Sequence, residues 1–501
     1  MALASGISID MSPEPILAAI DDYGGSIFDL DHALLVGPEL FAASRRALAR
    51  RMRSVGLKPA DRVIVAVGNG PLFLAAWAAV LAEGGSPLLV HVETPPAELK
   101  RIARRFLARF VVADALSESD FESVGARAKM LSLDLWSRLV WADFDEPADP
   151  RALARLDLPG VPLHPTSGTT GEPKVAVRPA ATAVAEVNHY VASIGIDRDD
   201  KLLALAPMSH AYAHGWCVVA PMVTGASLVT MRRFNAKLVF RACKECGITI
   251  LPAVASMLDT LVFGAGDRLH DPQRRVITGG APLTARTAAN FEKASGARAR
   301  PLYGTTEAGA IAVVRHDDSA KPGGCVGRPF DGVEVQIRRA DDIDSESDMR
   351  EFGPGVGLVH VRSKSVMAGY LNNETIDASP LPDGWFNTGD LGWIDADGAL
   401  HLRGRRAEVI NVSGMKVLPS EVEEVIGRMP GVIEVKVYAG RTRQGLHYVK
   451  AAVVAEEGID VGLIKSHCQE HLVYFKRPGR IILMDALPRS SRGKILREQL
   501  P

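Results

Sequence analysis

The chain has 501 residues, of which 47% are hydrophobic and 23% are charged, and its formal net charge is −1. This length predicts at least two domains, one of them large, and the near-neutral charge argues against a dedicated nucleic-acid binder, because such proteins carry a clear basic excess. The five cysteines are odd in number and do not form a disulfide framework, so we expect a protein of the reducing cytoplasm.

We expect no export signal in the N-terminal region. Residues 1–13 contain no Lys or Arg and no long apolar run, which is unlike a secretory leader. The most apolar stretch, residues 71–82, is far shorter than the roughly 20 residues that span a bilayer. We expect this stretch to be a buried helix, and we expect no integral membrane segment.

Helical and strand-like patterns alternate in the first half of the chain. In order, we expect a helix, a strand, a helix, a strand and a helix at residues 43–55, 62–67, 71–82, 87–92 and 96–106. This alternation predicts a parallel sheet covered by helices. The first of these helices is strongly basic, and we interpret its arginines as a solvated face rather than as a site for an anion.

The last hundred residues have a different pattern. Pro419 and Glu421 mark the start of a helix, because proline and acidic residues are favoured in a first turn. Two paired strands and a further helix are expected at residues 432–438, 447–454 and 461–472. The predicted fold is therefore α/β. A large N-terminal domain with helix-covered sheets (residues 1–403) precedes a small, mobile C-terminal α+β domain (residues 404–501).

The strongest chemical signal is the segment from residue 166 to residue 174, Thr-Ser-Gly-Thr-Thr-Gly-Glu-Pro-Lys. Its glycines allow a tight turn and close approach to a ligand, and successive exposed N–H groups can hold phosphate oxygens. The segment is not a Walker A loop, because no Lys directly follows its second glycine. We predict a phosphate-binding loop that consists of Thr166, Ser167, Gly168, Thr169, Thr170, Gly171 and Lys174.

This loop resembles the signature of the adenylate-forming superfamily, which includes acyl- and aryl-CoA synthetases, peptide-synthetase adenylation domains and luciferases. Further segments are similar to that family's motifs and follow in the expected order at residues 207–210, 279–283, 303–307, 384–390, 404–405, 413–417 and 488–494. The likeness covers nearly the whole chain and is strongest to bacterial-type AMP-forming acyl-CoA synthetases. It implies an enzyme that joins a carboxylic acid to AMP, releases pyrophosphate and passes the acyl group to a thiol.

The resemblance also implies how ATP is held. It places the adenine beside Gly280, Ala281, Pro282, Tyr303, Gly304 and Thr305. The Tyr303 ring would stack on the adenine, Asp390 would accept from both ribose hydroxyls, and Arg405 would add a ribose or phosphate contact. Thr306 would contact the α-phosphate, and Glu307 would bind the metal. The implied cofactors are ATP, Mg²⁺ and coenzyme A.

The family's catalytic lysine falls at Lys494, between the attacking carboxylate and the α-phosphate. A cation about 4 Å from a developing charge is worth on the order of 4 kcal/mol at an effective dielectric near 20. In the second half-reaction the small domain would rotate, so that Lys494 leaves and Gly414 arrives, with His210 and Gly414 lining the acyl and thiol tunnel. The chain departs from the pattern at the hinge, where Ala407 stands in place of the frequent Asp or Lys.

Two alternatives stay open. The thiol belongs to coenzyme A or to the phosphopantetheine arm of a carrier protein, which a stand-alone adenylation enzyme would load. A protein of another class would be a non-catalytic sensor of ATP or of an acyl-adenylate, although Lys494, Glu307 and Asp390 argue against it. The partner is a small-molecule carboxylic acid that the sequence does not identify. The pairs Cys243/Cys246 and His210/His214 lack the further ligands of a zinc site.

Overall fold

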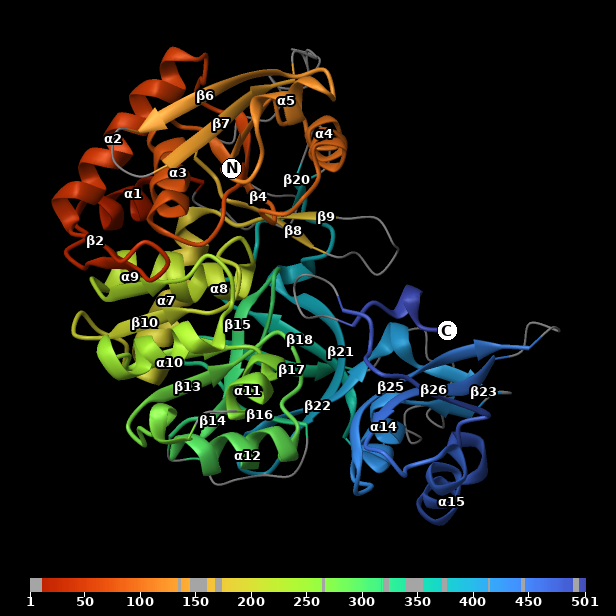
Figure 1. The fold of residues 1–501 in the computed structure, drawn as a ribbon. Helices are drawn as coiled ribbons and strands as arrows, with labels where there is room; N and C mark the ends of the chain where they lie inside the picture. The colour runs from red at the N-terminus through yellow and green to blue at the C-terminus, as the bar shows by residue number, and fades with distance from the viewer. Residues whose placement is uncertain are drawn as a thin grey trace. The chain divides into compact units, whose positions relative to one another are not determined.

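The computed structural model describes residues 11–133, 137–144, 160–166, 174–263, 266–316, 318, 324–338, 355–371, 376–412, 415–442, 447–489 and 495–501. The chain divides into two compact units (Figure 1). Unit 1 comprises Met1–Gly323, Gly327–Glu334 and Val361–Phe386, and unit 2 comprises Gly324–Val326, Val335–His360 and Asn387–Pro501. The predicted α/β fold with a small C-terminal α+β domain is confirmed. The predicted boundary after residue 403, which separates a large domain from a small mobile domain, stays a prediction.

The first sheet of unit 1 has nine strands in the order β20-β19-β9-β8-β4-β3-β5-β7-β6. Their bounds are Ile376–Asp377, Gly369–Leu371, Lys174–Val177, Leu163–Thr166, Ser86–Leu89, Arg62–Ala66, Phe110–Ala113, Ser137–Asp143 and Arg127–Leu133. The central strands β8, β4, β3 and β5 are parallel, as the alternating pattern predicts. The flanking strands are antiparallel, so the sheet is mixed rather than purely parallel.

Helices α2 (Pro38–Ser54), α3 (Pro71–Ala82), α4 (Pro96–Arg105) and α5 (Glu118–Glu122) accompany this sheet. The predicted bounds of α3 are confirmed, and every residue from Pro71 to Leu81 is buried. A helix that is apolar on all sides must be covered on all sides. Helix α3 contacts α1 (Glu14–Asp21), α2, β1 and the sheet, and these contacts explain its composition.

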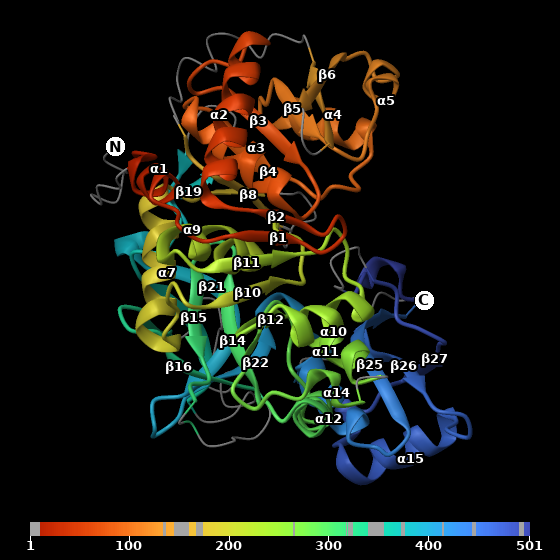
Figure 2. The same cartoon turned by 60° about the vertical axis from the view of Figure 1, so that its left-hand side comes forward.

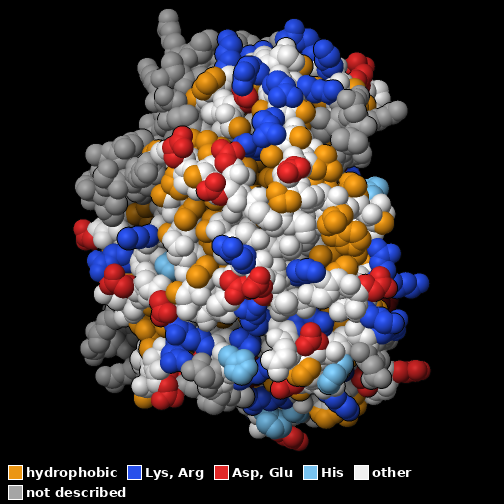
Figure 3. Space-filling view, turned by 90° about the vertical axis from the view of Figure 1, so that its left-hand side faces the viewer, with side chains coloured by type: hydrophobic (Ala, Val, Ile, Leu, Met, Phe, Trp, Pro, Cys, Tyr) orange, Lys and Arg blue, Asp and Glu red, His pale blue; other side chains and the backbone are white. Residues whose placement is uncertain are grey.

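The basic helix α2 lies at the surface, as expected. Arg46, Arg50 and Arg53 are exposed, and Figure 3 shows Lys and Arg side chains gathered at the top of the face that carries this part of unit 1. Arg53 forms two hydrogen bonds of 2.6 Å with Glu83, so part of the charge is neutralised within the unit. No helix among the described residues is both long and apolar enough to cross a membrane.

The second sheet of unit 1 runs β15-β14-β13-β12-β10-β11-β1-β2. These strands span Gly309–Val313, Ala299–Thr305, Arg275–Thr278, Ile250–Ala253, Lys201–Ala204, Ser227–Thr230, Ile27–Asp29 and Leu34–Val36. The six strands from β14 to β1 are parallel, and they are flanked by β2 and β15, which pair antiparallel with β1 and β14. Beside β15, β16 (Cys325–Pro329) also pairs antiparallel.

Helices surround this second sheet (Figure 2). They are α7 (Ala180–Ile194), α8 (Ala211–His214), the π-helix η1 (Gly215–Val219), α9 (Ala220–Thr224), α10 (Ala236–Glu245), α11 (Ala255–Val262), the 3₁₀ turn η2 (Gly266–Leu269) and α12 (Ala285–Ser295). A core that includes Leu203, Leu251, Val276, Leu258 and Phe291 joins the strands to α10, α11 and α12. This core makes the sheet a rigid platform for the loops at its edge.

Unit 2 contains the predicted α+β elements. Strands β25 (Val432–Arg441) and β26 (His447–Ala455) pair antiparallel, and β27 (Arg480–Leu483) joins them in parallel. Helices α14 (Pro419–Gly427) and α15 (Val461–His471) share one core with this sheet. The remaining elements that lie wholly or mostly in unit 2 are β17 (Glu334–Arg338), β18 (Gly357–Arg362), β21 (Phe386–Ile394), β22 (Leu400–Arg405), β23 (Ile410–Val412), β24 (Met415–Val417) and the 3₁₀ turns η4 (Arg406–Glu408), η5 (Tyr474–Lys476) and η6 (Arg497–Gln499), whereas the 3₁₀ turn η3 (Pro382–Gly384) belongs to unit 1.

Candidate active site

A β-hairpin holds both ends of the predicted phosphate loop. Strand β8 ends at Thr166 and β9 begins at Lys174, and these two residues are directly opposite each other in antiparallel register. The predicted residues between them, Ser167, Gly168, Thr169, Thr170 and Gly171, lie outside the described part of the chain. The structure therefore places the two ends of the loop side by side on the sheet.

The other predicted segments of unit 1 follow the carboxyl ends of neighbouring strands. His210 comes after β10, Gly280 after β13 and Glu307 after β14. Strands β10, β12, β13 and β14 are adjacent and parallel, so their carboxyl ends share one edge of the sheet. Open α/β sheets bind ligands at this edge. The predicted acyl, adenine and metal segments therefore come together at one edge.

Two glycines shape the loop after β13. A Cβ atom on Gly279 would lie 2.5 Å from the ring of Tyr212, whose hydroxyl donates to the carbonyl of Ile277 at 2.9 Å. Only a residue without a side chain allows this ring to pass so close to the backbone. Gly280 has a φ of +78°, a conformation that favours glycine. Gly280, Ala281 and Pro282 are exposed, and a ligand can reach them.

A bulge redirects the chain between Tyr303 and Glu307. The register between β14 and β15 shifts at Tyr303 and Gly304, and a turn follows in which Thr305 Oγ1 accepts from the N–H three residues on at 3.0 Å. Tyr303 is buried, whereas Thr306 and Glu307 are half-buried at the turn. Bulges of this kind re-aim side chains next to binding sites.

A tyrosine that the motif analysis missed links Lys174 to Glu307. The hydroxyl of Tyr370 donates to Oε1 of Glu307 at 2.8 Å, and the ammonium of Lys174 lies 4.8 Å from the centroid of the same ring. Strand β19 pairs with β9, so that Tyr370 is opposite Ala176. This pairing brings together residues almost 200 positions apart, and a short Gly-Tyr-Leu strand gives no local sign of it.

Asn69 is a second residue without a motif signal. Its amide oxygen accepts from the N–H of Met208 at 2.7 Å, and its amide nitrogen donates to the carbonyl of Ala206 at 3.0 Å. These two bonds fix the backbone just before His210, which is half-buried at the start of α8. Asn69 therefore positions the segment that is predicted to line the acyl and thiol tunnel.

His214, one turn after His210, lies in an aromatic cluster. Its ring is 5.3 Å from Trp77 and 5.0 Å from His164, with edge-to-face geometry in both pairs. Burial disfavours the charged imidazole and lowers the pKa of His214 to about 3. The same cause lowers the pKa of His164 well below its usual value. Both rings are therefore neutral in the folded protein near neutral pH.

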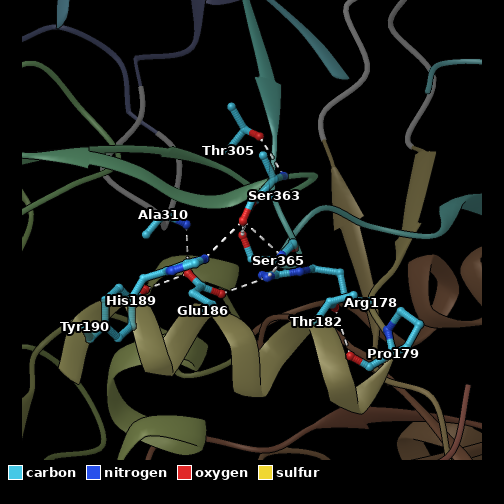
Figure 4. A network of polar contacts seen from close by, with 11 residues as sticks. Arg178, Pro179, Thr182, Glu186, His189, Tyr190, Thr305, Ala310, Ser363 and Ser365 are labelled. Atoms are coloured by element: carbon cyan, nitrogen blue, oxygen red, sulfur yellow. Dashed lines mark hydrogen bonds and ion pairs between the residues drawn. The ribbon is translucent and has the colours of Figure 1, made fainter. Parts of the chain in front are cut away.

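Arg178 and Glu186 form a buried ion pair (Figure 4). Arg178, which follows β9, donates to Glu186 of α7 at 2.8 Å and to the carbonyl of Ser365 at 3.2 Å. The other Glu186 oxygen accepts from the Tyr190 hydroxyl at 2.6 Å and from the N–H of Ala310 at 3.1 Å. The pair thus ties the segment that follows β9, the strand that carries Lys174, to strand β15, which follows Glu307.

In unit 2, Asp390 and Arg405 are directly opposite each other on β21 and β22. The Arg405 Nε lies 3.1 Å from Oδ1 of Asp390, and the carboxylate side chain is only 9% exposed. The N–H of Asp390 bonds to Thr388 Oγ1 at 3.1 Å, which orients the turn before it. The structure brings the two predicted ribose contacts together as an ion pair.

The two remaining predicted residues, Gly414 and Lys494, lie outside the described part of the chain. Their flanking segments are described: β23 and β24 pair antiparallel on either side of residues 413–414. Arg489 and Ile495 form an antiparallel bridge on either side of residues 490–494. Both segments therefore begin and end at paired backbone positions in unit 2.

Two ranges of this chain match models of known protein families. Residues 39–371 match the model of the AMP-binding enzyme family, and residues 421–494 match that of the AMP-binding enzyme C-terminal domain. This chain belongs to the AMP-binding enzyme family. Among its relatives is 4-coumarate–CoA ligase 1 of Oryza sativa subsp. japonica, which is 27% identical over 491 residues that cover 91% of this chain and 85% of the relative.

Solved structures of AMP-binding enzymes share the fold. ATP-bound MatB from Rhodopseudomonas palustris aligns with a TM-score of 0.81 at 23% identity, covering 97% of both chains. The O-succinylbenzoate coenzyme A synthetase MenE from Bacillus subtilis, in complex with ATP and a magnesium ion, aligns with a TM-score of 0.79 at 21% identity. That alignment covers 97% of this chain and 98% of MenE.

The residues around Glu307 fit a Mg²⁺ ion that is shared with a nucleotide. Within the described residues, no group of three or more His, Cys, Asp or Glu side chains could enclose a metal by itself. Mg²⁺ is usually held by one or two carboxylates together with substrate phosphates rather than by an all-protein cage. A half-buried carboxylate beside the phosphate-loop hairpin provides that kind of ligand.

Proposed function

We propose that this AMP-binding enzyme is an AMP-forming acid–CoA ligase. The observation that carries the proposal is the link from Lys174 through Tyr370 to Glu307, which sets a cation and a carboxylate beside the phosphate-loop hairpin. Charge on the phosphoryl oxygens is the main obstacle to phosphoryl-group chemistry, and preorganised cations lower it. The CoA ligase relatives support coenzyme A as the acceptor.

In the first half-reaction a carboxylate oxygen attacks the α-phosphorus of ATP, and the bond to pyrophosphate breaks. The loop from Thr166 to Lys174 holds the β- and γ-phosphates, and Thr306 contacts the α-phosphate. The Mg²⁺ that Glu307 would hold supplies charge neutralisation for the phosphates. By this proposal Lys494 acts on the carboxylate and the α-phosphate, and Asp390 and Arg405 bind the ribose. The adenine lies against Tyr303 and the loop around Gly280.

In the second half-reaction a thiolate attacks the acyl carbon, and AMP leaves. The domain formed by residues 404–501 rotates about Ala407, which withdraws Lys494 and brings Gly414 to the tunnel beside His210. Ala407 lies in the 3₁₀ turn η4 and is exposed. The five cysteines, an odd number, support a reducing, cytoplasmic setting.

The proposal is tested by a pyrophosphate-release screen over a panel of carboxylic acids. Purified protein with ATP and Mg²⁺ should release pyrophosphate with at least one acid and form a thioester once coenzyme A is added. Release of ADP and phosphate instead would refute the assignment. A thioester that forms on a phosphopantetheinylated carrier protein but not on coenzyme A would favour a stand-alone adenylation enzyme. ATP binding without turnover on any acid would favour a sensor.

A further inference from the structure

The side chain of Tyr370 contacts two proposed active-site residues with two different parts of one rigid group. Its hydroxyl donates to Glu307 Oε1 at 2.8 Å, and the face of its ring lies 4.8 Å from the Lys174 ammonium. A phenol hydroxyl bonded to a carboxylate fixes one oxygen of that carboxylate. Since a carboxylate has about four acceptor positions, the rest of its capacity is available to a metal ion.

The ring has a separate effect on Lys174. An ammonium ion is attracted to the face of an aromatic ring, by about 0.5–1 kcal/mol at exposed sites. Lys174 is exposed, and without a partner its long side chain would sample many rotamers. The ring also gives the ammonium an alternative to a direct ion pair with Glu307, which would occupy the carboxylate that the metal needs.

The backbones around these three side chains are fixed independently of Tyr370. The N–H of Met367 donates to the carbonyl of Glu307 at 2.7 Å, and Ser365 Oγ donates to the carbonyl of Ala308 at 2.8 Å. The buried Arg178–Glu186 pair adds bonds to the same two segments (Figure 4). Removing the Tyr370 hydroxyl should therefore free the Glu307 carboxylate without moving the chain that carries it.

We propose that Tyr370 is a positioning residue, which holds the Glu307 carboxylate for Mg²⁺ with its hydroxyl and holds Lys174 for the phosphates with its ring. This inference rests on the proposed function, because it takes Glu307 as the metal ligand. Groups that hydrogen-bond to metal ligands typically contribute 10- to 100-fold to metal affinity. The hydroxyl should therefore act on metal-dependent binding, and the ring on phosphate binding with or without metal.

The test is calorimetric titration of ATP, without any acid, into the wild type and into Tyr370→Phe and Tyr370→Leu. Each titration is done in Mg²⁺ and again in EDTA. Tyr370→Phe keeps the ring, so it should weaken binding roughly 10- to 100-fold in Mg²⁺ and hardly at all in EDTA. Tyr370→Leu should weaken binding in both. Tyr23→Phe is the matched control, since it removes a hydroxyl that donates to the Ser26 carbonyl at 3.2 Å and should bind ATP like the wild type.

A double-mutant cycle with Glu307→Gln completes the test. If Tyr370 acts through Glu307, adding Tyr370→Phe to Glu307→Gln should cause little further loss. Full additivity of the two losses, an equal loss for Tyr370→Phe in Mg²⁺ and in EDTA, or no loss at all would overturn the inference. Failure of the proposed function looks different, because the wild type would then release no pyrophosphate with any acid or would bind ATP no better in Mg²⁺ than in EDTA.

Discussion

Arg405 and Asp390 form a cross-strand ion pair in unit 2, with 3.1 Å between the Arg405 Nε and the Asp390 Oδ1. The aspartate is almost buried, whereas the arginine side chain is 41% exposed. The carboxylate is therefore held in place by its strand and by the arginine, while the arginine side chain is partly open to solvent. This asymmetry suits a site in which the carboxylate accepts hydroxyl groups and the guanidinium orients the carboxylate.

The first prediction concerns this pair. Asp390→Asn replaces an acceptor with a group that also donates, and hydrogen bonds to charged groups contribute about 1.5–3 kcal/mol. We expect the KM for ATP to rise about 10- to 100-fold, and Arg405→Met to have a smaller effect in the same direction. The control is 2′-deoxy-ATP. The wild type should use it much less well than ATP, whereas Asp390→Asn should use the two nucleotides almost equally well. An equal penalty for the deoxy analogue in both proteins would remove Asp390 from the ribose site.

The second prediction concerns the buried pair Arg178–Glu186, whose side chains are 3% and 5% exposed. Removing one partner leaves a buried charge uncompensated, which costs about 3–5 kcal/mol, whereas replacing both partners with apolar residues costs much less. Glu186→Leu should therefore lower the urea midpoint strongly. Adding Arg178→Met to Glu186→Leu should recover more than half of that loss.

The exposed pair Arg362–Glu334 serves as the comparison, because its side chains are 47% and 58% exposed. Glu334→Gln should leave the urea midpoint close to that of the wild type, since exposed ion pairs contribute little to stability. If Glu334→Gln and Glu186→Leu have equal effects, burial does not determine the contribution of the pair. If the double substitution is no better than Glu186→Leu, the loss comes from the bonds to Tyr190 and Ala310 rather than from the unpaired arginine.

Local pattern predicted much of the framework but little of how the site is held together. The bounds of α3 follow from a proline at its start and an unbroken apolar run, and the β25–β26 pair follows from alternation around a polar turn. The contact of Tyr370 with Glu307 depends instead on β19 pairing with β9, far away in sequence. A three-residue strand has too few residues to show a period, so only the folded chain reveals which strand it joins.

The first sheet was predicted to be parallel but is mixed, because local pattern does not show how the strands at its sides pair. The alternation of strands and helices correctly indicated the parallel centre, where crossover helices connect the strands. Strands β6 and β7 pair antiparallel with each other, and β7 also pairs antiparallel with β5, which makes this side of the sheet antiparallel. Asn69 was missed because a lone Asn after a strand is an ordinary turn residue.

The third prediction concerns pH. Burial lowers the pKa of His214 from its usual value near 6.5 to about 3, so below pH 6.5 the unfolded chain binds a proton that the folded chain does not. Stability therefore falls as the pH falls from 6.5 towards 3, by about 1.4 kcal/mol per pH unit for this group. His214→Phe keeps a ring beside Trp77. Between pH 4.5 and 6 it should reduce the slope of the unfolding free energy against pH by the amount that corresponds to about one bound proton.

Measurements at pH 8 provide the internal control for this variant. There the imidazole is neutral in both states, so any difference between His214→Phe and the wild type reports packing alone. His164 contributes to the slope in the same direction, because burial also lowers its pKa, and a residual slope in His214→Phe is expected. An unchanged slope would mean that the His214 ring gains its proton in the folded protein at the same pH as in the unfolded one.

The last prediction separates the two half-reactions. By the proposed mechanism Lys494 stabilises charge in the adenylation transition state and is absent from the site during thioester formation. Lys494→Ala should lower adenylate formation by roughly 100- to 10,000-fold, the scale of losing a preorganised electrostatic group. Thioester formation from a chemically supplied acyl-adenylate should fall far less. Equal losses in both steps would mean that Lys494 serves folding or general binding.

The hinge variant should show the reverse pattern. Ala407 lies inside the 3₁₀ turn η4, and Ala407→Pro fixes φ and removes an N–H at the position about which the domain is proposed to turn. Adenylation should persist in Ala407→Pro while thioester formation fails. Ala407→Gly is the matched control, since it keeps the N–H and frees the backbone, and it should retain both steps. If Ala407→Pro supports both steps as well, rotation about this residue is not part of the reaction, and the thiol must reach the acyl-adenylate with the domain in its first position.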